Sequence, residues 1–216
     1  MKPIILYEDD SLIVVDKPSN LVVHQTVDTS RPHLLQALEE NNRELYLINR
    51  LDKDTSGVVL IAKNIDAANV YSSLFAERTI EKSYFAIVEG EVDFEEKTIS
   101  NFLGPVKGMK NIYTSVRSGG KIAETNFKKV SANSSFSLIQ ALPKTGRTHQ
   151  IRVHLTELGY PIAGDTEYGA PFRRQFKRTM LHASSINLMH PYTKNRLAIS
   201  SPFPEDFQSS ISFLGL

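Results

Sequence analysis

The chain has 216 residues, of which 41% are hydrophobic and 23% are charged, and this composition fits one soluble globular domain over residues 1–216. It has no cysteine, which excludes disulfides and thiolate metal sites, and no apolar run approaches the roughly 18 residues of a membrane span. The formal net charge is only +1, so any surface for phosphate groups must come from local clusters of cations. The N-terminus reaches acidic residues too soon for a signal peptide, and we expect a cytoplasmic protein.

The first half of the chain predicts strands and helices in alternation. Two short strands are expected at residues 4–7 and 12–16, joined by an acidic turn. Pro32 can open a helix that extends to about residue 42. The apolar run 57–62 predicts a central strand buried on both faces. Residues 66–77 carry apolar side chains at helical spacing and predict an amphipathic helix.

The second half predicts mainly strands. One helix is expected over residues 148–158, with Thr148 as its N-cap and Gly159 at its C-terminal end. The expected strands are residues 82–92, a hairpin of 123–130 and 136–142, and two closing strands near 180–189 and 196–200. Because strands dominate and the helices are interleaved irregularly, the α+β class is favoured over a regular βαβ fold.

The segment 49–57, Asn-Arg-Leu-Asp-Lys-Asp-Thr-Ser-Gly, places a carboxylate in a turn of small residues just before the apolar run. Held there, Asp52 is a candidate nucleophile or general acid/base. Arg50 can stack in the gap left by an extruded base. The plainer alternative is that Asp52 and Asp54 are ordinary loop carboxylates and Arg50 is their surface partner.

A second segment, residues 146–155, reads Gly-Arg-Thr-His-Gln-Ile-Arg-Val-His-Leu. The free N–H groups at the start of its helix suit an anion, with Arg147, His149 and Gln150 beside them. Arg152 lies next to the buried stripe and therefore needs an acidic partner, which makes a structural ion pair the plain alternative. His149 and His154 lack a matched third ligand, so no metal site is predicted.

These two segments resemble the R-L-D-x-x-T-S-G and G-R-T-H-Q-I-R-V-H motifs of the RluA-type pseudouridine synthases. Further matching pieces, in the family's order, are residues 16–19, the K-x-Y motif at 82–84, and residues 164–169 and 181–183. The resemblance extends from about residue 5 to about residue 204. Two positions depart from the pattern: Asn49 replaces the usual histidine and cannot titrate, and Asn20 replaces the usual glycine.

The resemblance implies a pseudouridine synthase fold, with a central, mostly antiparallel mixed sheet, flanking helices and a catalytic cleft. In this family the N1–C1′ bond of a uridine breaks, the base turns while bound, and C5 joins C1′ without a cofactor or metal. Carried over by position, Asp52 is the catalytic aspartate and Arg152 its ion-pair partner. Tyr84 stacks on the base, and Arg50 supports the flipped-out state. The S4-like RNA-binding domain of many relatives is expected to be absent.

Two local clusters of cations could bind phosphate groups although the net charge of the chain is close to zero. The denser cluster contains Arg173, Arg174, Lys177 and Arg178, and a second lies at residues 107–110. Each is open to the plain interpretation of a solvated loop. Given the resemblance, contact with the RNA backbone is favoured, and Arg147, His149 and Gln150 are expected to bind RNA or the target base.

The sequence therefore predicts an RNA pseudouridine synthase that acts as a monomer on structured rRNA or tRNA, with no obligate protein partner. The alternative from another class is a non-catalytic RNA-binding or RNA-remodelling protein that retains the fold, for which Asn49 is the hint. A glycosidase is disfavoured because Asp52 and Asp54 are too close in one loop to span a sugar. A nucleotide-binding enzyme lacks its glycine-rich motif.

Overall fold

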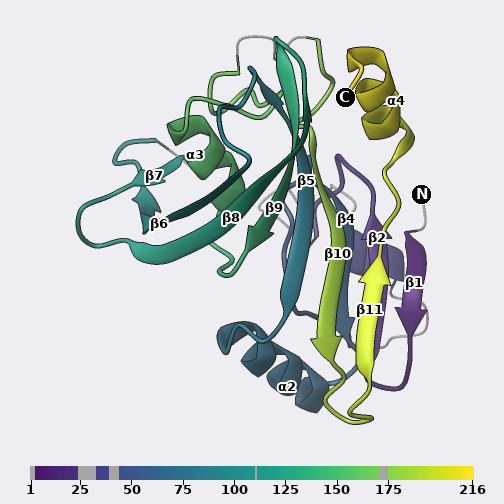
Figure 1. Ribbon diagram of the computed structural model, residues 1–216. Coiled ribbons are helices and arrows are strands. Elements are labelled where there is room, and N and C mark those ends of the chain that lie inside the picture. The colour runs from purple at the N-terminus through teal and green to yellow at the C-terminus, as the bar shows by residue number, and fades with distance from the viewer. Residues whose placement is uncertain (1–2, 24–32, 39–43, 110, 171–174) are drawn as a thin grey trace. The chain divides into compact units, whose positions relative to one another are not determined.

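A computed structural model describes residues 3–23, 33–38, 44–109, 111–170 and 175–216 of the chain (Figure 1). The chain divides into two compact units, each assembled from two segments. The first unit contains Met1–Lys82 and His182–Pro204, and the second contains Ser83–Leu181 and Glu205–Leu216. The predicted single domain thus contains two compact parts. None of the helices in the described ranges is long and apolar enough to cross a membrane.

The first unit is built on a mixed sheet. Its strands follow the order β1, β2, β4, β10 and β11, with the short strand β3 also paired to β4. Their bounds are β1 Ile4–Glu8, β2 Leu12–Lys17, β3 Tyr46–Leu47, β4 Ser56–Ala62, β10 Leu181–Met189 and β11 Arg196–Ser200. β4 pairs with β10 in parallel, whereas the pairs β1–β2, β2–β4, β3–β4 and β10–β11 are antiparallel.

The core of this unit lies between β4 and helix α2 (Ile65–Ala76). All seven residues of β4 are buried, which confirms the strand expected from the apolar run. α2 presents Ala67 and Tyr71 to the same core as Leu60, and Asn64 caps it by accepting a hydrogen bond from the N–H of Ala67 at 2.8 Å. The strands and the helix predicted for the first 80 residues are therefore confirmed where they are described. Of the helix expected from Pro32, the structure describes α1 (Leu34–Leu38), while Pro32 itself lies outside the described residues.

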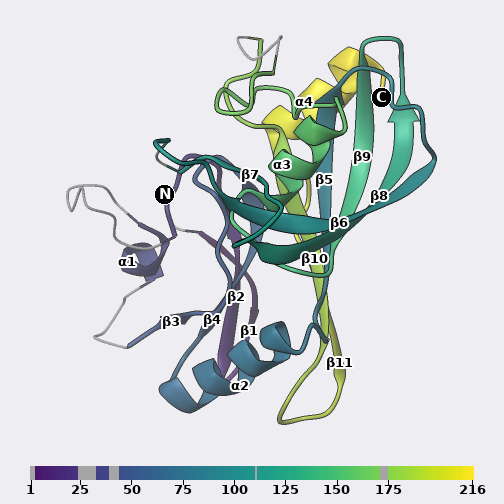
Figure 2. The ribbon, with the colours of Figure 1, turned by 90° about the vertical axis from the view of Figure 1, so that its left-hand side faces the viewer.

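The second unit is built on an antiparallel sheet in the order β5, β9, β8, β6 and β7 (Figure 2). The bounds are β5 Glu81–Glu89, β6 Glu96–Pro105, β7 Tyr113–Ser115, β8 Lys121–Ala132 and β9 Phe136–Pro143. The predicted hairpin of β8 and β9 is confirmed. Helix α3 (Gln150–Glu157) lies against β7 and β8. Helix α4 (Glu205–Leu214) is tied to the β8–β9 turn, since the side chain of Asn133 donates a 2.7 Å hydrogen bond to the carbonyl of Leu214.

Several features of the second unit were not expected from the sequence. β6 was not predicted, because its first three residues are all polar and exposed and the strand lacks a regular alternation of apolar and polar side chains. α3 does not use Thr148 as its N-cap. His149 holds that position in a left-handed conformation with φ of 56° and without a capping side-chain hydrogen bond. Gly159 does lie just beyond the helix with φ of 87°, as predicted. Both units together confirm the α+β class and a mixed, mostly antiparallel arrangement.

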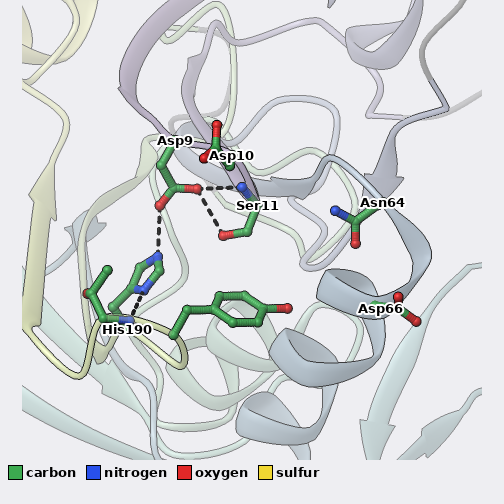
Figure 3. A pocket seen from close by; sticks show the side chains of 8 residues that line it. Asp9, Asp10, Ser11, Asn64, Asp66 and His190 are labelled. Carbon is green, nitrogen blue, oxygen red and sulfur yellow. Dashed lines mark hydrogen bonds and ion pairs between the residues drawn. The ribbon is translucent and has the colours of Figure 1, made fainter.

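A polar network joins the β1–β2 turn, the β10–β11 turn and α2 in the first unit, and Figure 3 shows its members Asp9, Ser11 and His190. Asp9, in the turn between β1 and β2, lies 2.8 Å from Nε2 of His190 in the β10–β11 turn. His190 accepts a hydrogen bond from the N–H of Thr193 at Nδ1, so Nε2 carries the hydrogen and donates it to Asp9. The hydroxyl of Tyr71 on α2 lies 3.1 Å from the same Nε2 and 3.2 Å from Ser11. Burial raises the pKa of Tyr71 to about 12, so it stays protonated in this network.

Asp9 is a carboxylate that the fold holds in its ionised form. Its burial would raise the pKa, but hydrogen bonds from the N–H of Ser11, the hydroxyls of Tyr7 and Ser11 and the N–H of Leu12 outweigh burial and lower it well below its usual range. As the pH falls, the Asp9 carboxylate is therefore protonated at a higher pH in the unfolded chain than in the folded protein. The stability that Asp9 contributes is present above a pH of about 4 and is lost as the pH falls further.

We expect Asp9→Asn to lower the free energy of unfolding at pH 7 by about 1 kcal/mol or more, because an amide cannot accept the same set of hydrogen bonds. The variant should also lose less stability than the wild type between a pH of about 5 and about 2. Urea denaturation followed by circular dichroism across this range measures both effects. Asp10→Asn, at the exposed neighbouring position, is the control and should leave both unchanged. Equal acid sensitivity of Asp9→Asn and the wild type would contradict this account of Asp9.

Candidate active site

The Asp52 loop is a tight turn between two buried positions. The N–H of Thr55 donates to the carbonyl of Asp52 at 3.2 Å, closing the turn over Lys53 and Asp54. Leu51 is 7% exposed and Thr55 is 2% exposed, so both ends of the turn are anchored in the core. Asp52 itself is only half-buried. A carboxylate in this setting has a fixed position and remains within reach of a substrate.

A buried lysine fastens the loop from one side. Lys17, at the end of β2, is 0% exposed, and its ammonium group donates to the carbonyls of Pro18, Leu21 and Lys53 at 2.9, 2.9 and 3.0 Å. These three acceptors match the three N–H donors of an ammonium group. Lys53 is the residue after Asp52, so the hydrogen bonds that satisfy the buried cation also fix the loop. Lys17 lies in one of the segments that match the family's motifs, residues 16–19, but the sequence predicted no role for it.

The loop is fastened from the other side by β10. Ser56 lies 3.0 Å from Nδ1 of His182, whose Nε2 lies 3.2 Å from the carbonyl of Ser201, and both side chains of the Ser56–His182 pair are buried. The next residue, Gly57, has φ of 113°, and a Cβ atom there would lie 2.1 Å from the carbonyl oxygen of Ala183. The glycine of the first motif is therefore required by a close backbone approach between β4 and β10.

The residues before Asp52 face different surroundings. Asn49 accepts a 2.7 Å hydrogen bond from the N–H of Leu60 and donates a 3.4 Å hydrogen bond to the carbonyl of Val58. Its amide thus pairs with the backbone of β4, which gives the departure from the family's histidine a structural role. Arg50 is exposed, as its predicted contact with RNA requires.

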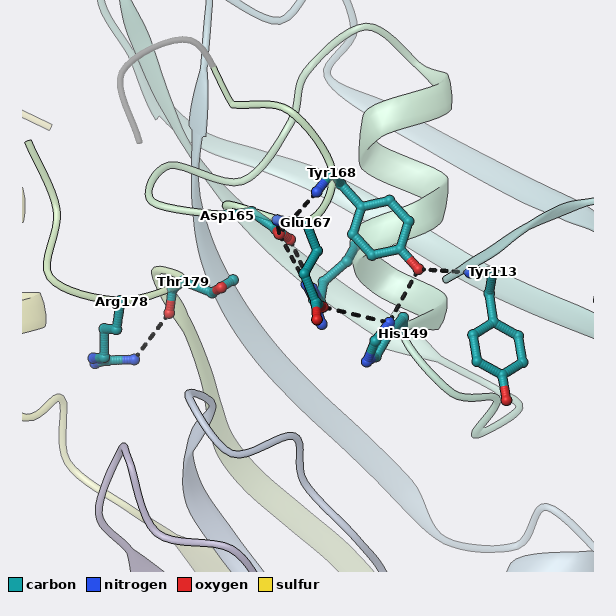
Figure 4. Close-up of polar contacts among 8 residues, drawn as sticks. Tyr113, His149, Asp165, Glu167, Tyr168, Arg178 and Thr179 are labelled. Atoms are coloured by element: carbon teal, nitrogen blue, oxygen red, sulfur yellow. Dashed lines mark hydrogen bonds and ion pairs between the residues drawn. The ribbon is translucent and has the colours of Figure 1, made fainter. Parts of the chain in front are cut away.

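Arg152 is held in a cage formed by Asp165, Glu167 and Tyr168 of the second unit; Figure 4 shows these three side chains. Its guanidinium donates from Nε to Asp165 at 2.6 Å, from Nη2 to Asp165 at 2.8 Å, and from Nη2 to Glu167 at 2.6 Å. The side chains of Arg152 and Asp165 are 7% and 1% exposed, so the pair is buried. The prediction of an acidic partner is met by Asp165 and Glu167. Asp52 belongs to the other unit, and its predicted pair with Arg152 stays a prediction.

The ring of Tyr168 forms the floor of this cage, with its centroid 4.8 Å from the guanidinium carbon of Arg152. The Tyr168 hydroxyl accepts a hydrogen bond from the N–H of Tyr113 and lies 3.0 Å from Nδ1 of His149 (Figure 4). Burial raises the pKa of Tyr168 to about 12, so its hydroxyl keeps its proton at neutral pH. His149 therefore belongs to the cage through Tyr168, a contact that the sequence did not indicate.

The side chains of Gln150 and Arg147 make hydrogen bonds to other residues of the second unit. Gln150 is 4% exposed; its oxygen accepts from the hydroxyl of Thr145 and the N–H of Arg147, while its amide group donates to Glu124 and Thr125. Its predicted role in base binding is corrected accordingly, because all its hydrogen-bonding groups are used inside the fold. Arg147 is half-buried and donates from Nε to the carbonyl of Ile122 at 2.9 Å.

The basic cluster divides between the surface and the interior. Lys177 is exposed, whereas Arg173 and Arg174 lie outside the described residues. Arg178 is 3% exposed and donates to Asp206 from Nε at 2.6 Å and from Nη2 at 3.1 Å. The prediction that Arg178 contacts RNA phosphates is corrected, because its guanidinium is buried in an ion pair with α4.

Tyr84 occupies a half-buried position on β5, where it is paired in register with Ala141 of β9. Among the described residues, no cluster of three or more histidine and acidic side chains is arranged to hold a metal ion.

The first unit has a second polar feature, a pocket of about 440 Å³ beside the Asp9 network (Figure 3). Its lining includes Asp9, Asp10 and Asp66 and neither lysine nor arginine. Such a surface repels phosphate groups. The pocket is thus a poor site for a nucleic acid, and the Asp52 loop remains the candidate centre of that unit.

Comparisons with known proteins agree with these motifs. Residues 11–157 match the family model described as RNA pseudouridylate synthase. The ribosomal large subunit pseudouridine synthase C of Vibrio cholerae is 37% identical over 96% of this chain and 68% of its own length. The ribosomal large subunit pseudouridine synthase D of Pseudomonas aeruginosa is 34% identical over 97% of this chain and 71% of its own length.

Two solved structures are also similar. The structure of human RNA pseudouridylate synthase domain containing 4 has a TM-score of 0.80 and 29% identity, covering 98% of this chain and 93% of that one. That of human RNA pseudouridylate synthase domain containing 1 has a TM-score of 0.76 and 28% identity, covering 94% of this chain and 84% of that one. The pseudouridine synthase fold implied by the sequence motifs is confirmed.

We expect Gly57→Ala to destabilise the first unit by about 3 kcal/mol or more, since it combines an unfavourable φ with a clash against the Ala183 carbonyl. Gly159→Ala is a matched control, because Gly159 also has a positive φ but no atom near its Cβ position. The control should cost only about 1–2 kcal/mol. Urea denaturation of both variants measures the difference. Similar losses of unfolding free energy in the two variants would mean that the clash with the Ala183 carbonyl does not contribute to the effect of Gly57→Ala.

Proposed function

This chain belongs to the RNA pseudouridylate synthase family, and from that premise we propose that it converts specific uridines of large-subunit ribosomal RNA to pseudouridine with Asp52 as the catalytic carboxylate. The chain is a pseudouridine synthase, an isomerase. The choice of RNA rests on one observation: the named relatives that align with nearly all of this chain act on the large ribosomal subunit. Transfer RNA is the second candidate substrate from the sequence.

The reaction sets the requirements for the site. The N1–C1′ bond must break, the free base must rotate, and a C5–C1′ bond must form while C5 loses a proton and N1 gains one. Whether the carboxylate attacks C1′, attacks the ring or removes the proton, it must be ionised and fixed next to the nucleotide. Asp52 meets the second requirement, because Lys17 and the core residues at both ends of the turn fix its loop. No step in this scheme needs a cofactor or a metal.

We assign the remaining roles from position in the motifs and from burial. Tyr84 offers a ring face on which the base can rotate without losing its stacking contact. Arg152 provides a buried positive charge as the proposed partner of Asp52. Arg50 is exposed and is assigned to the space that the flipped nucleotide leaves, since a base inside a helix cannot present its glycosidic bond to a carboxylate.

Binding of the RNA backbone is assigned to Arg173, Arg174 and Lys177, of which the structure describes Lys177, at an exposed position. His149 is assigned to the neighbourhood of Arg152, through Tyr168. Since the substrate is ribosomal RNA, we place the enzyme in the cytoplasm. We propose that it binds this RNA as a monomer, without an obligate protein partner.

The decisive test maps pseudouridine in ribosomal and transfer RNA from cells that contain or lack this gene. We expect one or more large-subunit positions to lose the modification without the gene, and wild-type protein to restore it. Asp52→Asn should fail to restore it. With purified protein, the same variant should lower turnover by about 10² or more, because it removes the carboxylate charge with little change in shape. Asp54→Asn, two residues away in the same loop, is the matched control and should retain turnover.

Two outcomes would contradict this proposal separately. Loss of modification from transfer RNA alone would refute the choice of substrate. Turnover by Asp52→Asn within about tenfold of the wild type, with unchanged folding, would refute the catalytic role of Asp52.

We also expect binding to RNA to weaken steeply with salt although the net charge is only +1. Neutralising Arg173, Arg174 and Lys177 together should flatten the plot of log affinity against log salt by about 0.7–0.9 for each lost phosphate contact. Arg178 is left intact because its buried ion pair stabilises the fold. Filter binding at several salt concentrations gives the slope.

The control for this measurement neutralises Lys194 and Arg196, which lie on the β10–β11 hairpin near the acidic pocket. Their loss should leave the slope unchanged. An unchanged slope in the triple variant would show that the basic cluster does not contact RNA phosphates.

A further inference from the structure

An exposed loop of the second unit, residues 116–120, connects β7 to β8. These two strands lie on opposite edges of β6, since Ser115 of β7 and Lys121 of β8 both pair in register with Leu103. The chain therefore crosses over β6 within this loop. A loop of this kind must be held closely at its ends, whereas its tip is free to meet a ligand.

The ends of the loop are fixed against β6. The N–H of Val116 donates to the carbonyl of Phe102 at 2.8 Å. At the other end, a Cβ atom on Gly120 would lie 2.5 Å from the Val116 side chain and 2.9 Å from the carbonyl oxygen of Leu103. The crossing thus requires a glycine at this position, and its close contacts give the loop one shape.

The tip of the loop is open to solvent. Arg117, Ser118 and Gly119 are exposed, and a Cβ atom on Gly119 would meet no atom within 4 Å. Lys121, the first residue of β8, is also exposed. Neither the Arg117 guanidinium nor the Lys121 ammonium group forms an ion pair or hydrogen bond with the residues that the structure describes. The tip therefore presents two cations and small residues to solvent.

A third cation is anchored next to Lys121. Arg147 donates from Nε to the carbonyl of Ile122 at 2.9 Å, and Ile122 follows Lys121 directly in β8. In the described part of the chain, no group accepts a hydrogen bond from Nη1 or Nη2 of Arg147. One donor thus holds the guanidinium in place, and the others are available to a ligand.

The β6–β7 turn brings a fourth cation to the same region. β7 has three residues and extends for only about 10 Å, so the turn before it and the loop after it are a short distance apart. Lys107 of that turn is exposed and belongs to the second cluster of cations predicted from the sequence. Positive charge is therefore present at both ends of β7.

The carboxylates of the neighbouring elements are already bound. Glu124 of β8 pairs with Lys144 at 2.9 Å, which neutralises its charge. Glu157 of α3 accepts from the N–H of Ser115 at 2.7 Å and from the hydroxyl of Thr114 at 3.2 Å. Because Glu157 opposes several cations, positive charge prevails around the loop.

We propose that the β7–β8 loop binds the phosphate backbone of the RNA substrate, with Arg117 and Lys121 as its main contacts. Arg147 and Lys107 flank them. This inference rests on the proposed function, which makes ribosomal RNA the ligand. The two cations supply charge, and the small residues between them let the backbone N–H groups and the Ser118 hydroxyl approach a phosphate. Such contacts position the RNA and do not read its bases.

The test measures affinity by filter binding at several salt concentrations, with a transcript of large-subunit ribosomal RNA as the probe. Arg117→Gln and Lys121→Gln are combined in an Asp52→Asn background, so that the measurement does not depend on turnover. Arg147 stays intact because its Nε bonds to β8. We expect the plot of log affinity against log salt to flatten by about 1.4–1.8, from about 0.7–0.9 for each lost phosphate contact. Mixed transfer RNA, a structured RNA of unrelated sequence, should show the same change.

The matched control combines Lys97→Gln and Lys128→Gln in the same background. It removes the same charge from β6 and β8 at the opposite end of these strands. Lys128 pairs with Glu96, and the Lys97 ammonium group lies 5.7 Å from the centroid of the Phe94 ring. The control should leave the slope unchanged.

Each outcome decides the proposal. An unchanged slope in the variant of Arg117 and Lys121 overturns it and would leave these cations for an acidic protein surface. Equal flattening in both double variants also overturns it, because only net charge would then matter. If the double variant does not fold, Arg117→Gln alone should flatten the slope by about 0.7–0.9, and no change would again overturn the proposal. A wild-type protein that binds RNA with the expected slope but forms no pseudouridine would instead refute the proposed function.

Discussion

The arrangement around Asp52 depends on one constraint: a buried cation must find an acceptor for each of its donors. The ammonium of Lys17 is fully buried, and leaving it without acceptors would cost several kcal/mol. It is satisfied by three backbone carbonyls, one of which belongs to Lys53 in the Asp52 loop. A change in the shape of the loop would therefore remove the hydrogen bond between the Lys17 ammonium group and the carbonyl of Lys53. Stability of the fold and geometry of the candidate nucleophile are linked through the same hydrogen bonds.

The second unit follows the same constraint with arginine. Arg152 and Arg178 are both buried and both pair with an aspartate through Nε and Nη2. Their further partners differ: Arg178 donates from Nη1 to the backbone carbonyls of Thr179 and Leu181, whereas Arg152 has a second acidic partner in Glu167. A buried arginine is thus not a functional residue by virtue of its charge or burial alone.

Much of the fold follows from local patterns in the sequence. The apolar run of β4 predicts a strand buried on both faces, and the helical spacing of Ala67 and Tyr71 predicts the buried face of α2. These patterns succeed because the packing of each element is uniform along its length: β4 is buried on both faces, and α2 is buried on one face. β6 was not predicted because its exposed and polar side chains leave no alternation to detect. The N-cap of α3 was predicted wrongly. Thr148 is a residue type that favours the N-cap position, whereas the position is held by His149 in a left-handed conformation that its residue type does not predict.

The sequence by itself determined the family, the catalytic candidate Asp52 and the need of Arg152 for an acidic partner, because these depend on residue types at short spacings. Only the tertiary structure showed that Asp165 and Glu167 pair with Arg152, and it buried Gln150 and Arg178, which the sequence had assigned to RNA. It also joined Ser56 to His182, residues 126 positions apart. The physical reason is that burial and hydrogen-bond partners are properties of chain segments brought together by folding. The sequence does not distinguish a cation that faces solvent from one that is buried in an ion pair. Lys177 and Arg178 are neighbours in one basic run, yet Lys177 is exposed and Arg178 pairs with Asp206 of α4.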